Sequence, residues 1–127
     1  MFQHVNNVSQ QMYFDLGKAD FYRQVLQDDV LSGTSRIITA ATANSFKEQI
    51  RMEDDIYVTT TVAKVGNKSI TLFQQIIGRN AAGRETVKTE STSVMVAFDF
   101  DRQESVTVPE RWRRNLADSV SYTHLRA

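Results

Sequence analysis

Three residues near the start of the sequence, His4, Asn6 and Asn7, stand directly before an apolar stretch with helical spacing. The first turn of a helix presents backbone N–H groups without partners inside the helix, and it carries a partial positive charge. Such amides can polarise a carbonyl group and stabilise an oxyanion, and one donor of this kind lowers a barrier by about 3 kcal/mol. Asparagine is also among the best N-cap residues, so a purely structural role fits Asn6 and Asn7 as well. His4 has the same two interpretations, as a hydrogen-bonded structural residue or as part of a catalytic site.

Other common catalytic arrangements do not match the residue types. The sequence has no cysteine, which excludes disulfides, thiolate zinc sites and a cysteine nucleophile. The segment Gly33-Thr34-Ser35-Arg36 lacks the second glycine of a nucleophile elbow, and a glycine-rich phosphate loop is also missing. We therefore expect neither a metal nor a bound cofactor, which leaves the polar cluster at the helix start as the candidate site.

Length and charge restrict the class of protein. A chain of 127 residues with 41% hydrophobic and 24% charged residues is typical of one soluble globular domain. Fifteen basic residues balance fifteen acidic ones, so no net field attracts nucleic acid or anionic lipid. No apolar run reaches the roughly 18 residues of a membrane-spanning helix, and no secretory signal is present. A reducing compartment fits the absence of cysteine, and we expect a cytoplasmic location.

The two ends of the sequence differ from the rest. Residues 120–127 resemble one reading frame of an adapter used in sequencing libraries, so we expect a non-native tail there and a domain at residues 1–119. We interpret Met1 as an internal methionine of a longer reading frame, because nothing before His4 could form a first strand. The expected chain is a domain that lacks its first strand.

The sequence pattern between the ends predicts one long helix followed by an antiparallel meander. Apolar residues recur with helical spacing from Val8 to about Leu26, and we expect them to form a broad buried face. Its members are Val8, Met12, Leu16 and Ala19, widened by Phe14, Phe21, Tyr22 and Val25. Gly17 inside this helix indicates close contact with a neighbouring sheet. This order is an α+β layout with the helix packed on one sheet face. Strands are predicted at 37–46, 56–63, 69–77, 86–100 and 106–108, turns at 65–68, 79–83 and 101–104, and a short helix at 109–116.

Several motifs occur in an order that is similar to a known family. The sequence resembles the hotdog-fold acyl-CoA thioesterases of the 4-hydroxybenzoyl-CoA thioesterase type over about residues 1–118. The motifs are Phe2-Gln3-His4-Val5-Asn6-Asn7 with Tyr13-Phe14 and Phe21-Tyr22 after it, Asp54-Asp55, Gly66-Asn67-Lys68-Ser69, Phe98-Asp99-Phe100-Asp101 and Val108-Pro109-Glu110.

The resemblance implies a fold and a reaction. The fold is a long central helix wrapped by a curved antiparallel sheet, and subunits pair as a dimer or a dimer of dimers with active sites at the interface. Members hydrolyse the thioester of acyl-CoA to a free acid and CoA without a metal or bound cofactor. The family's motif has a carboxylate, the general base or nucleophile, at the position immediately before Met1.

The resemblance also implies roles for individual residues. The backbone N–H of Asn7 faces the thioester oxygen, His4 and Asn6 shape the catalytic site, and Met12 lines the acyl tunnel between subunits. Ser69 is a polar hairpin residue near the partner subunit. The nucleotide of CoA would meet local positive charges on the surface, for which the candidates are Lys68, Arg79, Arg84 and Lys88.

Two alternatives stay open at the level of the sequence. The first is a hotdog-fold enzyme of other chemistry, an acyl-carrier-protein thioesterase or a hydratase. A hydratase needs a histidine and an acid as a pair, which we do not find, and carrier-protein binding favours a basic docking patch that is not evident. The second alternative is a non-catalytic acyl-binding or assembly module.

Overall fold

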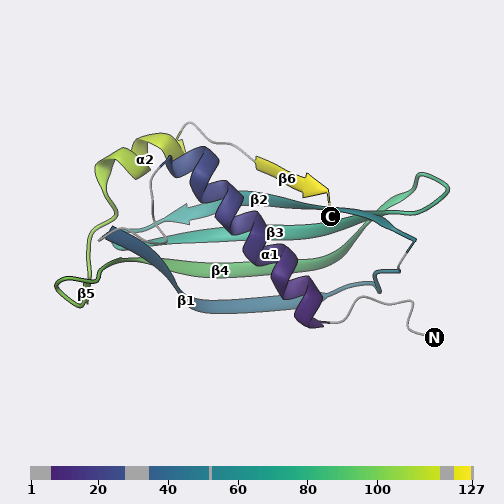
Figure 1. The fold of residues 1–127 in the computed structure, drawn as a ribbon, viewed down its shortest axis with the longest axis horizontal. Helices are drawn as coiled ribbons and strands as arrows, with labels where there is room; N and C mark the ends of the chain where they lie inside the picture. Colours follow the sequence, from purple (N-terminus) through teal and green to yellow (C-terminus); the bar gives the residue numbers. More distant parts are fainter. Residues whose placement is uncertain (1–6, 28–34, 52, 118–121, 127) are drawn as a thin grey trace.

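The computed structural model describes residues 7–27, 35–51, 53–117 and 122–126. One helix, α1 (Asn7–Phe21), continues into a π-helical turn at Tyr22–Leu26 and lies across one face of an antiparallel sheet (Figure 1). Gln27 ends the helix in the left-handed conformation at φ 56°. The expected α+β architecture is confirmed. The other elements are β1 (Ser35–Phe46), β2 (Asp55–Val65), β3 (Ser69–Arg79), β4 (Glu85–Asp99), β5 (Glu104–Ser105), α2 (Glu110–Ala117) and β6 (Tyr122–Arg126).

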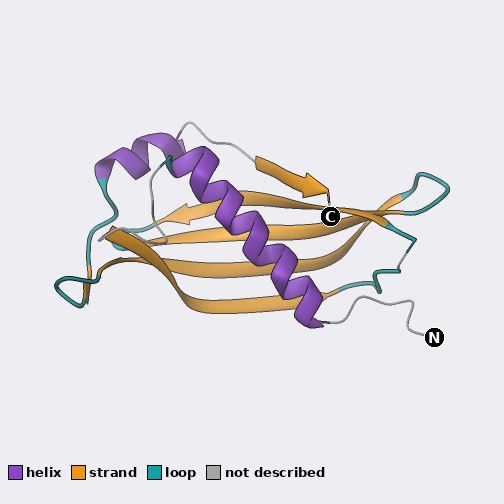
Figure 2. Cartoon of the chain, viewed as in Figure 1, coloured by secondary structure: helices purple, strands orange, loops and turns teal. Residues whose placement is uncertain are grey.

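The strands form one sheet in the order β1-β4-β3-β2-β6, with β5 added to the end of β4. Figure 2 shows that the long strands run side by side while the loops gather at the two ends of the sheet. In β3, buried and half-buried residues alternate from Ser69 to Gly78, as a strand with one face under a helix requires. The three predicted turns are present: the hairpin between β2 and β3, the turn around Asn80–Arg84, and the turn between β4 and β5.

The face of α1 that meets the sheet differs in part from the prediction. Met12 and Leu16 are 58% and 52% exposed, so their expected burial within this chain is wrong. The expected burial of Phe14, Phe21 and Tyr22 is confirmed, and Gly17 is buried on the same side of the helix. A Cβ built at Gly17 would lie only 2.9 Å from Gln74 Nε2 and 3.1 Å from Val58 Cγ1, which confirms that this glycine permits close helix–sheet contact.

Two apolar clusters hold α1 to the sheet, with polar side chains between them. One cluster packs the end of α1 and the π-helical turn against α2, and its centre is Trp112, which is fully buried. The other lies nearer the start of α1 around Phe14 and Ile76. Between them the inner sheet face carries buried polar residues from three strands: Thr60, Gln74, Thr89, Ser91 and Ser93.

The C-terminal part of the chain closes the sheet at the end opposite the start of α1. Arg113 donates from Nη2 to the carbonyl oxygens of Gly66 and Asn67, at 2.6 and 2.9 Å, which fixes α2 onto the β2–β3 hairpin. The predicted strand at 106–108 is wrong, because strand pairing stops at Ser105. Beyond it, Val106 and Val108 donate to different segments, the carbonyls of Ala97 and Asn67.

Strand β6 lies at the sheet edge beside β2, within the segment that we expect to be a non-native tail. Its pairing with β2 covers an edge that would otherwise present unpaired backbone groups. The native or non-native origin of residues 120–127 stays a prediction.

Candidate functional site

Helix α1 begins at Asn7, the residue whose backbone amide the sequence analysis selected. The start of the helix sits against the sheet through two side-chain hydrogen bonds. Thr89 Oγ1 on β4 donates to Gln10 Oε1 at 2.5 Å, and Asn44 Nδ2 on β1 donates to Gln11 Oε1 at 3.3 Å. The first turn contains no acidic residue, so nothing in it neutralises the partial positive charge of the helix N-terminus. His4 and Asn6 lie outside the described residues, and their roles stay predictions.

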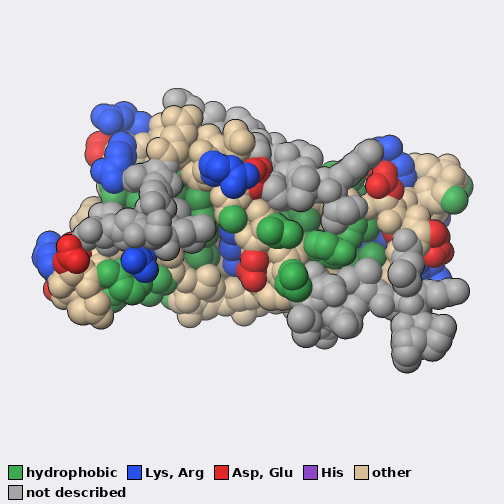
Figure 3. All heavy atoms as spheres, in the orientation of Figure 1, with side chains coloured by type: hydrophobic (Ala, Val, Ile, Leu, Met, Phe, Trp, Pro, Cys, Tyr) green, Lys and Arg blue, Asp and Glu red, His purple; other side chains and the backbone are tan. Residues whose placement is uncertain are grey.

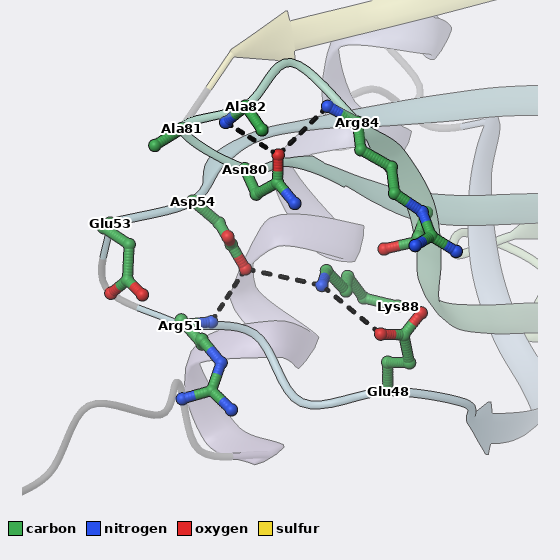
Figure 4. A pocket seen from close by; sticks show the side chains of 10 residues that line it. Glu48, Arg51, Glu53, Asp54, Asn80, Ala81, Ala82, Arg84 and Lys88 are labelled. Carbon is green, nitrogen blue, oxygen red and sulfur yellow. Dashed lines mark hydrogen bonds and ion pairs between the residues drawn. The ribbon is translucent and has the colours of Figure 1, made fainter.

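A polar cavity of about 460 Å³ opens at the same end of the sheet (Figure 4). It lies between the segment joining β1 to β2 and the turn joining β3 to β4. Lys88, the neighbour of Thr89, lines it, so the cavity is adjacent to the start of α1. In Figure 4 the side chains of Glu48, Asp54 and Lys88 converge on one another, while those of Glu53 and Arg51 point outward.

The centre of this cavity is an ion pair between buried groups. Lys88 Nζ lies 3.5 Å from Asp54 Oδ2 and 3.9 Å from Glu48 Oε1, and the side chains of Lys88 and Asp54 are 9% and 3% exposed. Asp54 Oδ2 also accepts the backbone N–H of Arg51 at 2.9 Å. We assign a structural role to Lys88, because breaking a buried ion pair leaves an uncompensated charge and destabilises the fold.

The candidates for binding the CoA nucleotide are distributed over both ends of the sheet. Arg84 and Lys88 line the polar cavity. Arg79 pairs with Glu85 at 2.6 Å on the surface, which raises the pKa of the guanidinium and lowers that of the carboxyl group. Lys68 belongs to the β2–β3 hairpin at the other end. Within one chain these four positive charges therefore do not form a single patch.

The two residues expected to bind the substrate, Met12 and Ser69, also lie far from each other within one chain. Met12 is on the exposed side of α1, an orientation compatible with a tunnel wall shared with another subunit. Ser69 pairs with Val96, far along β4 from Thr89 and the start of α1. Within one chain the structure does not bring Ser69 close to Asn7.

Sequence reasoning missed a second cavity, which lies between α1 and β1 and measures about 280 Å³. Asp15, Lys18 and Tyr22 line it from the helix, and their spacing of three and four residues puts them on one helix face. Burial, and then the charge of Asp15, raise the pKa of Tyr22 far above its usual value. Burial lowers the pKa of Lys18, against the opposing effect of Asp15. The helical spacing of these polar residues was visible in the sequence, but their burial was not.

Neither a metal centre nor a membrane span emerges from the described residues. Within them, His, Cys, Asp and Glu nowhere gather in a group of three that could hold an ion. None of the helices in this part of the chain has the length and apolar content needed to cross a bilayer.

The fold is similar to that of known proteins. A predicted thioesterase from Bacillus stearothermophilus superimposes with a TM-score of 0.80 at 22% identity, covering 93% of this chain and 84% of that one. A mutant of 4-hydroxybenzoyl-CoA thioesterase in complex with 4-hydroxybenzoyl-CoA gives 0.78 at 12% identity, with 90% and 86% covered. A thioesterase from Thermus thermophilus, complexed with coenzyme A and Zn, gives 0.75 at 18% identity, with 90% and 84% covered.

Sequence comparison gives the family. No curated protein sequence matches this chain significantly. The family model described as the thioesterase-like superfamily matches residues 1–116, which include α1, the four long strands and most of α2. The expected hotdog fold is thereby confirmed, and the chain belongs to the thioesterase-like superfamily.

Proposed function

We propose that this protein is an acyl-CoA thioesterase that hydrolyses the thioester of an acyl-CoA to a carboxylic acid and CoA. Its family and the hotdog arrangement support a thioester hydrolase. The observation that carries the proposal is the start of α1 at Asn7, held by hydrogen bonds to β1 and β4 at the end of the sheet where the polar cavity opens. Two of the similar structures are described as complexes with CoA or an acyl-CoA, which supports this substrate class.

In the proposed mechanism the first backbone amides of α1 polarise the thioester carbonyl and stabilise the oxyanion that forms when water attacks. This contribution is about 3 kcal/mol for one well-placed donor. His4 and Asn6 shape the surroundings of the carbonyl. A general base takes the proton from water, a contribution of roughly 10²–10⁴-fold. Collapse of the tetrahedral intermediate breaks the C–S bond, and the thiolate of CoA leaves as a stable anion.

We also propose that two copies of the chain pair along β1. This strand is at the end of the sheet, and its other side has no partner strand in the described residues. Exposed apolar side chains lie nearby, namely Phe46 on β1 and Met12 and Leu16 on α1, and an exposed apolar group of this kind is typical of an interface. Pairing there would supply Ser69 from the partner to the site. The proposed location is the cytoplasm, and neither nucleic acid nor a membrane is a proposed partner.

The test of the activity uses Asn7→Pro and Asn7→Ala. Proline at the first residue of a helix keeps the helix but removes the backbone N–H, whereas alanine keeps it. With short, long and aromatic acyl-CoAs, thiol release should fall about a hundredfold or more in Asn7→Pro and much less in Asn7→Ala. Equal rates in the two variants at matched stability would remove the amide from the mechanism.

A second comparison tests the general base. A chain extended upstream to include a carboxylate directly before Met1 should hydrolyse a short acyl-CoA at least about a hundredfold faster than residues 1–127. If both chains bind acyl-CoA and neither hydrolyses it, the protein is an acyl-binding module and the proposed activity is wrong.

A further inference from the structure

The cavity between α1 and β1 is apolar on its sheet side and polar on its helix side. Ile37, Thr39 and Met95 line it from the sheet, and Asp15, Lys18 and Tyr22 line it from the helix. Figure 3 shows hydrophobic side chains gathered on this face of the molecule, over and beside α1, with charged side chains among them. Such a mixture, largely apolar with a few convergent polar groups, is characteristic of small-molecule sites.

Two buried residues of this cavity carry hydrogen-bond donors, and one of these donors, the hydroxyl of Tyr22, has no partner among the described residues. Tyr22 is 4% exposed, and its hydroxyl group has no hydrogen-bond partner in the part of the chain that the structure describes. Tyr22 lines the cavity together with Lys18, one helical turn earlier on α1. Lys18 is 5% exposed although its ammonium group needs solvent or a counter-ion. An unsatisfied buried donor costs about 1–3 kcal/mol, and more when it is charged.

The other polar groups around the cavity do not satisfy these donors. Asp15 is exposed, and its Oδ1 accepts from Gln11 Nε2 at 3.0 Å. The hydroxyl of Thr39 is directed to the sulfur of Met95 at 3.5 Å. The cavity lining therefore has one unsatisfied buried donor, the hydroxyl of Tyr22, together with the cationic side chain of Lys18, and an oxygen acceptor inside the cavity could bind both.

The cavity also lies at a useful distance from the proposed reaction centre. Lys18 is eleven residues after Asn7 in the same helix, which is about 16 Å along the helix axis. An extended chain of single bonds advances about 1.2 Å per bond, so an acyl group of about twelve or thirteen carbons spans this length. Both places lie along the boundary between α1 and β1, with Gln11 and Asn44 near one end and Tyr22 and Ile37 at the other.

We propose that this cavity binds the far end of the acyl group, and that Lys18 and Tyr22 select acyl groups that end in a carboxylate. This inference rests on the proposed function and adds the substrate class, a dicarboxylic acyl-CoA of medium length. A carboxylate there would accept a charge-assisted hydrogen bond from Lys18 and a second bond from the hydroxyl of Tyr22. The negative charge of Asp15, which lines the same cavity, opposes this binding, and solvent screening reduces its effect because the side chain is exposed.

The test measures binding separately from hydrolysis. The probes are hydrolysis-resistant thioether analogues of dodecanedioyl-CoA and dodecanoyl-CoA, whose affinities are compared by calorimetry. The chain should bind the dicarboxylic analogue at least about tenfold more tightly, and Lys18→Met should abolish this preference. Tyr22→Phe keeps the packing of the ring, removes only the hydroxyl, and should reduce the preference severalfold. The matched control is Lys64→Met, which removes an exposed lysine on β2 and should leave the preference unchanged.

Equal affinity for the two analogues, a preference that survives Lys18→Met, or a lack of binding by both analogues would each overturn this inference. Hydrolysis of dodecanoyl-CoA is measured in parallel and reports on the proposed function alone. Hydrolysis without a preference for the dicarboxylic analogue would support the proposed thioesterase activity and reject the carboxylate subsite. Binding that depends on Lys18 without turnover keeps the subsite and removes the activity.

Discussion

The side chain of Lys88 crosses the backbone of Gly78, and a Cβ at Gly78 would lie only 2.6 Å from Lys88 Cε. Lys88 occupies a β-bulge, since Val87 and Thr89 pair with consecutive residues of β3 while Lys88 has no partner opposite. The bulge turns the lysine across the neighbouring strand so that its ammonium group reaches Asp54. Gly78 therefore belongs to the ion pair although it carries no side chain.

Gly78→Ala should destabilise the protein by about 1–3 kcal/mol, because the new methyl group displaces the lysine from its buried partner. The measurement is the free energy of unfolding in urea. Lys88→Ala provides the control background, since truncating the lysine makes room for the methyl group. The cost of Gly78→Ala should fall to below about 0.5 kcal/mol there. If Gly78→Ala lowers the free energy of unfolding equally in both backgrounds, the side chain of Lys88 is not what limits the space at Gly78.

Gly17→Ala should also destabilise, although alanine is the better helix former by about 1 kcal/mol. The added methyl group meets Gln74, whose Nε2 donates to the carbonyl of Phe14 at 3.0 Å and to Thr60 Oγ1 at 3.1 Å. We expect a net loss of about 1–2 kcal/mol by urea denaturation. In a Gln74→Ala background the sign should change or the cost should nearly vanish; if it does not, Gln74 is not the side chain that limits helix approach.

Lys18→Met should stabilise the protein at neutral pH, since it removes a charge that burial disfavours. The pKa of Lys18 in the folded state is below its ordinary value of 10.5, so between these two values the unfolded chain binds more protons. The stability of the parent chain therefore rises with pH through that window. The advantage of Lys18→Met should shrink between neutral pH and pH of about 10. Ionisation of Tyr22 affects the stability of the parent chain and of Lys18→Met alike, so it cancels when the two free energies of unfolding are subtracted.

The control for this titration is Lys64→Met, whose stability difference from the parent should be small and independent of pH. A loss of stability in Lys18→Met at neutral pH would mean that the amine has a structural partner. A gain in stability together with the loss of dicarboxylate preference is the pattern of a residue retained for binding at the expense of stability.

The sequence predicted the main elements well because their signals are local. Periodicity gave the helix to within one residue at its start, and alternation gave the four long strands. The predicted buried face of α1 was right for Phe14 and Phe21 but wrong for Met12 and Leu16, for a tertiary reason. Met12 and Leu16 fit a buried stripe by hydrophobicity, but the sheet beneath carries Gln74 and Thr89, and it packs against Phe14, Gly17 and Phe21. Periodicity indicates a helix, whereas the partner surface decides which face is buried.

The candidate site also has one part that the sequence predicted and other parts that it did not. The start of α1 at Asn7 followed from the motif, which is contiguous in the sequence. The pairing of Lys88 with Asp54 depends on a bulge in β4 and on a glycine in β3, and neither has a local signal that points to the other. The cavity around Lys18 likewise needs Ile37 and Met95 from two strands, so only the fold brings its walls together.

The proposed pairing along β1 leads to a final prediction about Phe46. This residue is 51% exposed and pairs with Thr89, whose side chain contacts α1 through Gln10. The side chain of Phe46 therefore lies on the sheet face that carries α1, and Leu16 is an exposed residue of that helix. Phe46→Glu and Leu16→Glu should each weaken a dimer at least about tenfold, because they put a charge into an apolar contact. Light scattering after gel filtration should then give the monomer mass at low micromolar concentration. Thr92→Glu changes an exposed residue of β4 on the opposite face and should keep the dimer mass. If all four proteins, including the unmodified chain, elute with one mass, this surface is not the interface.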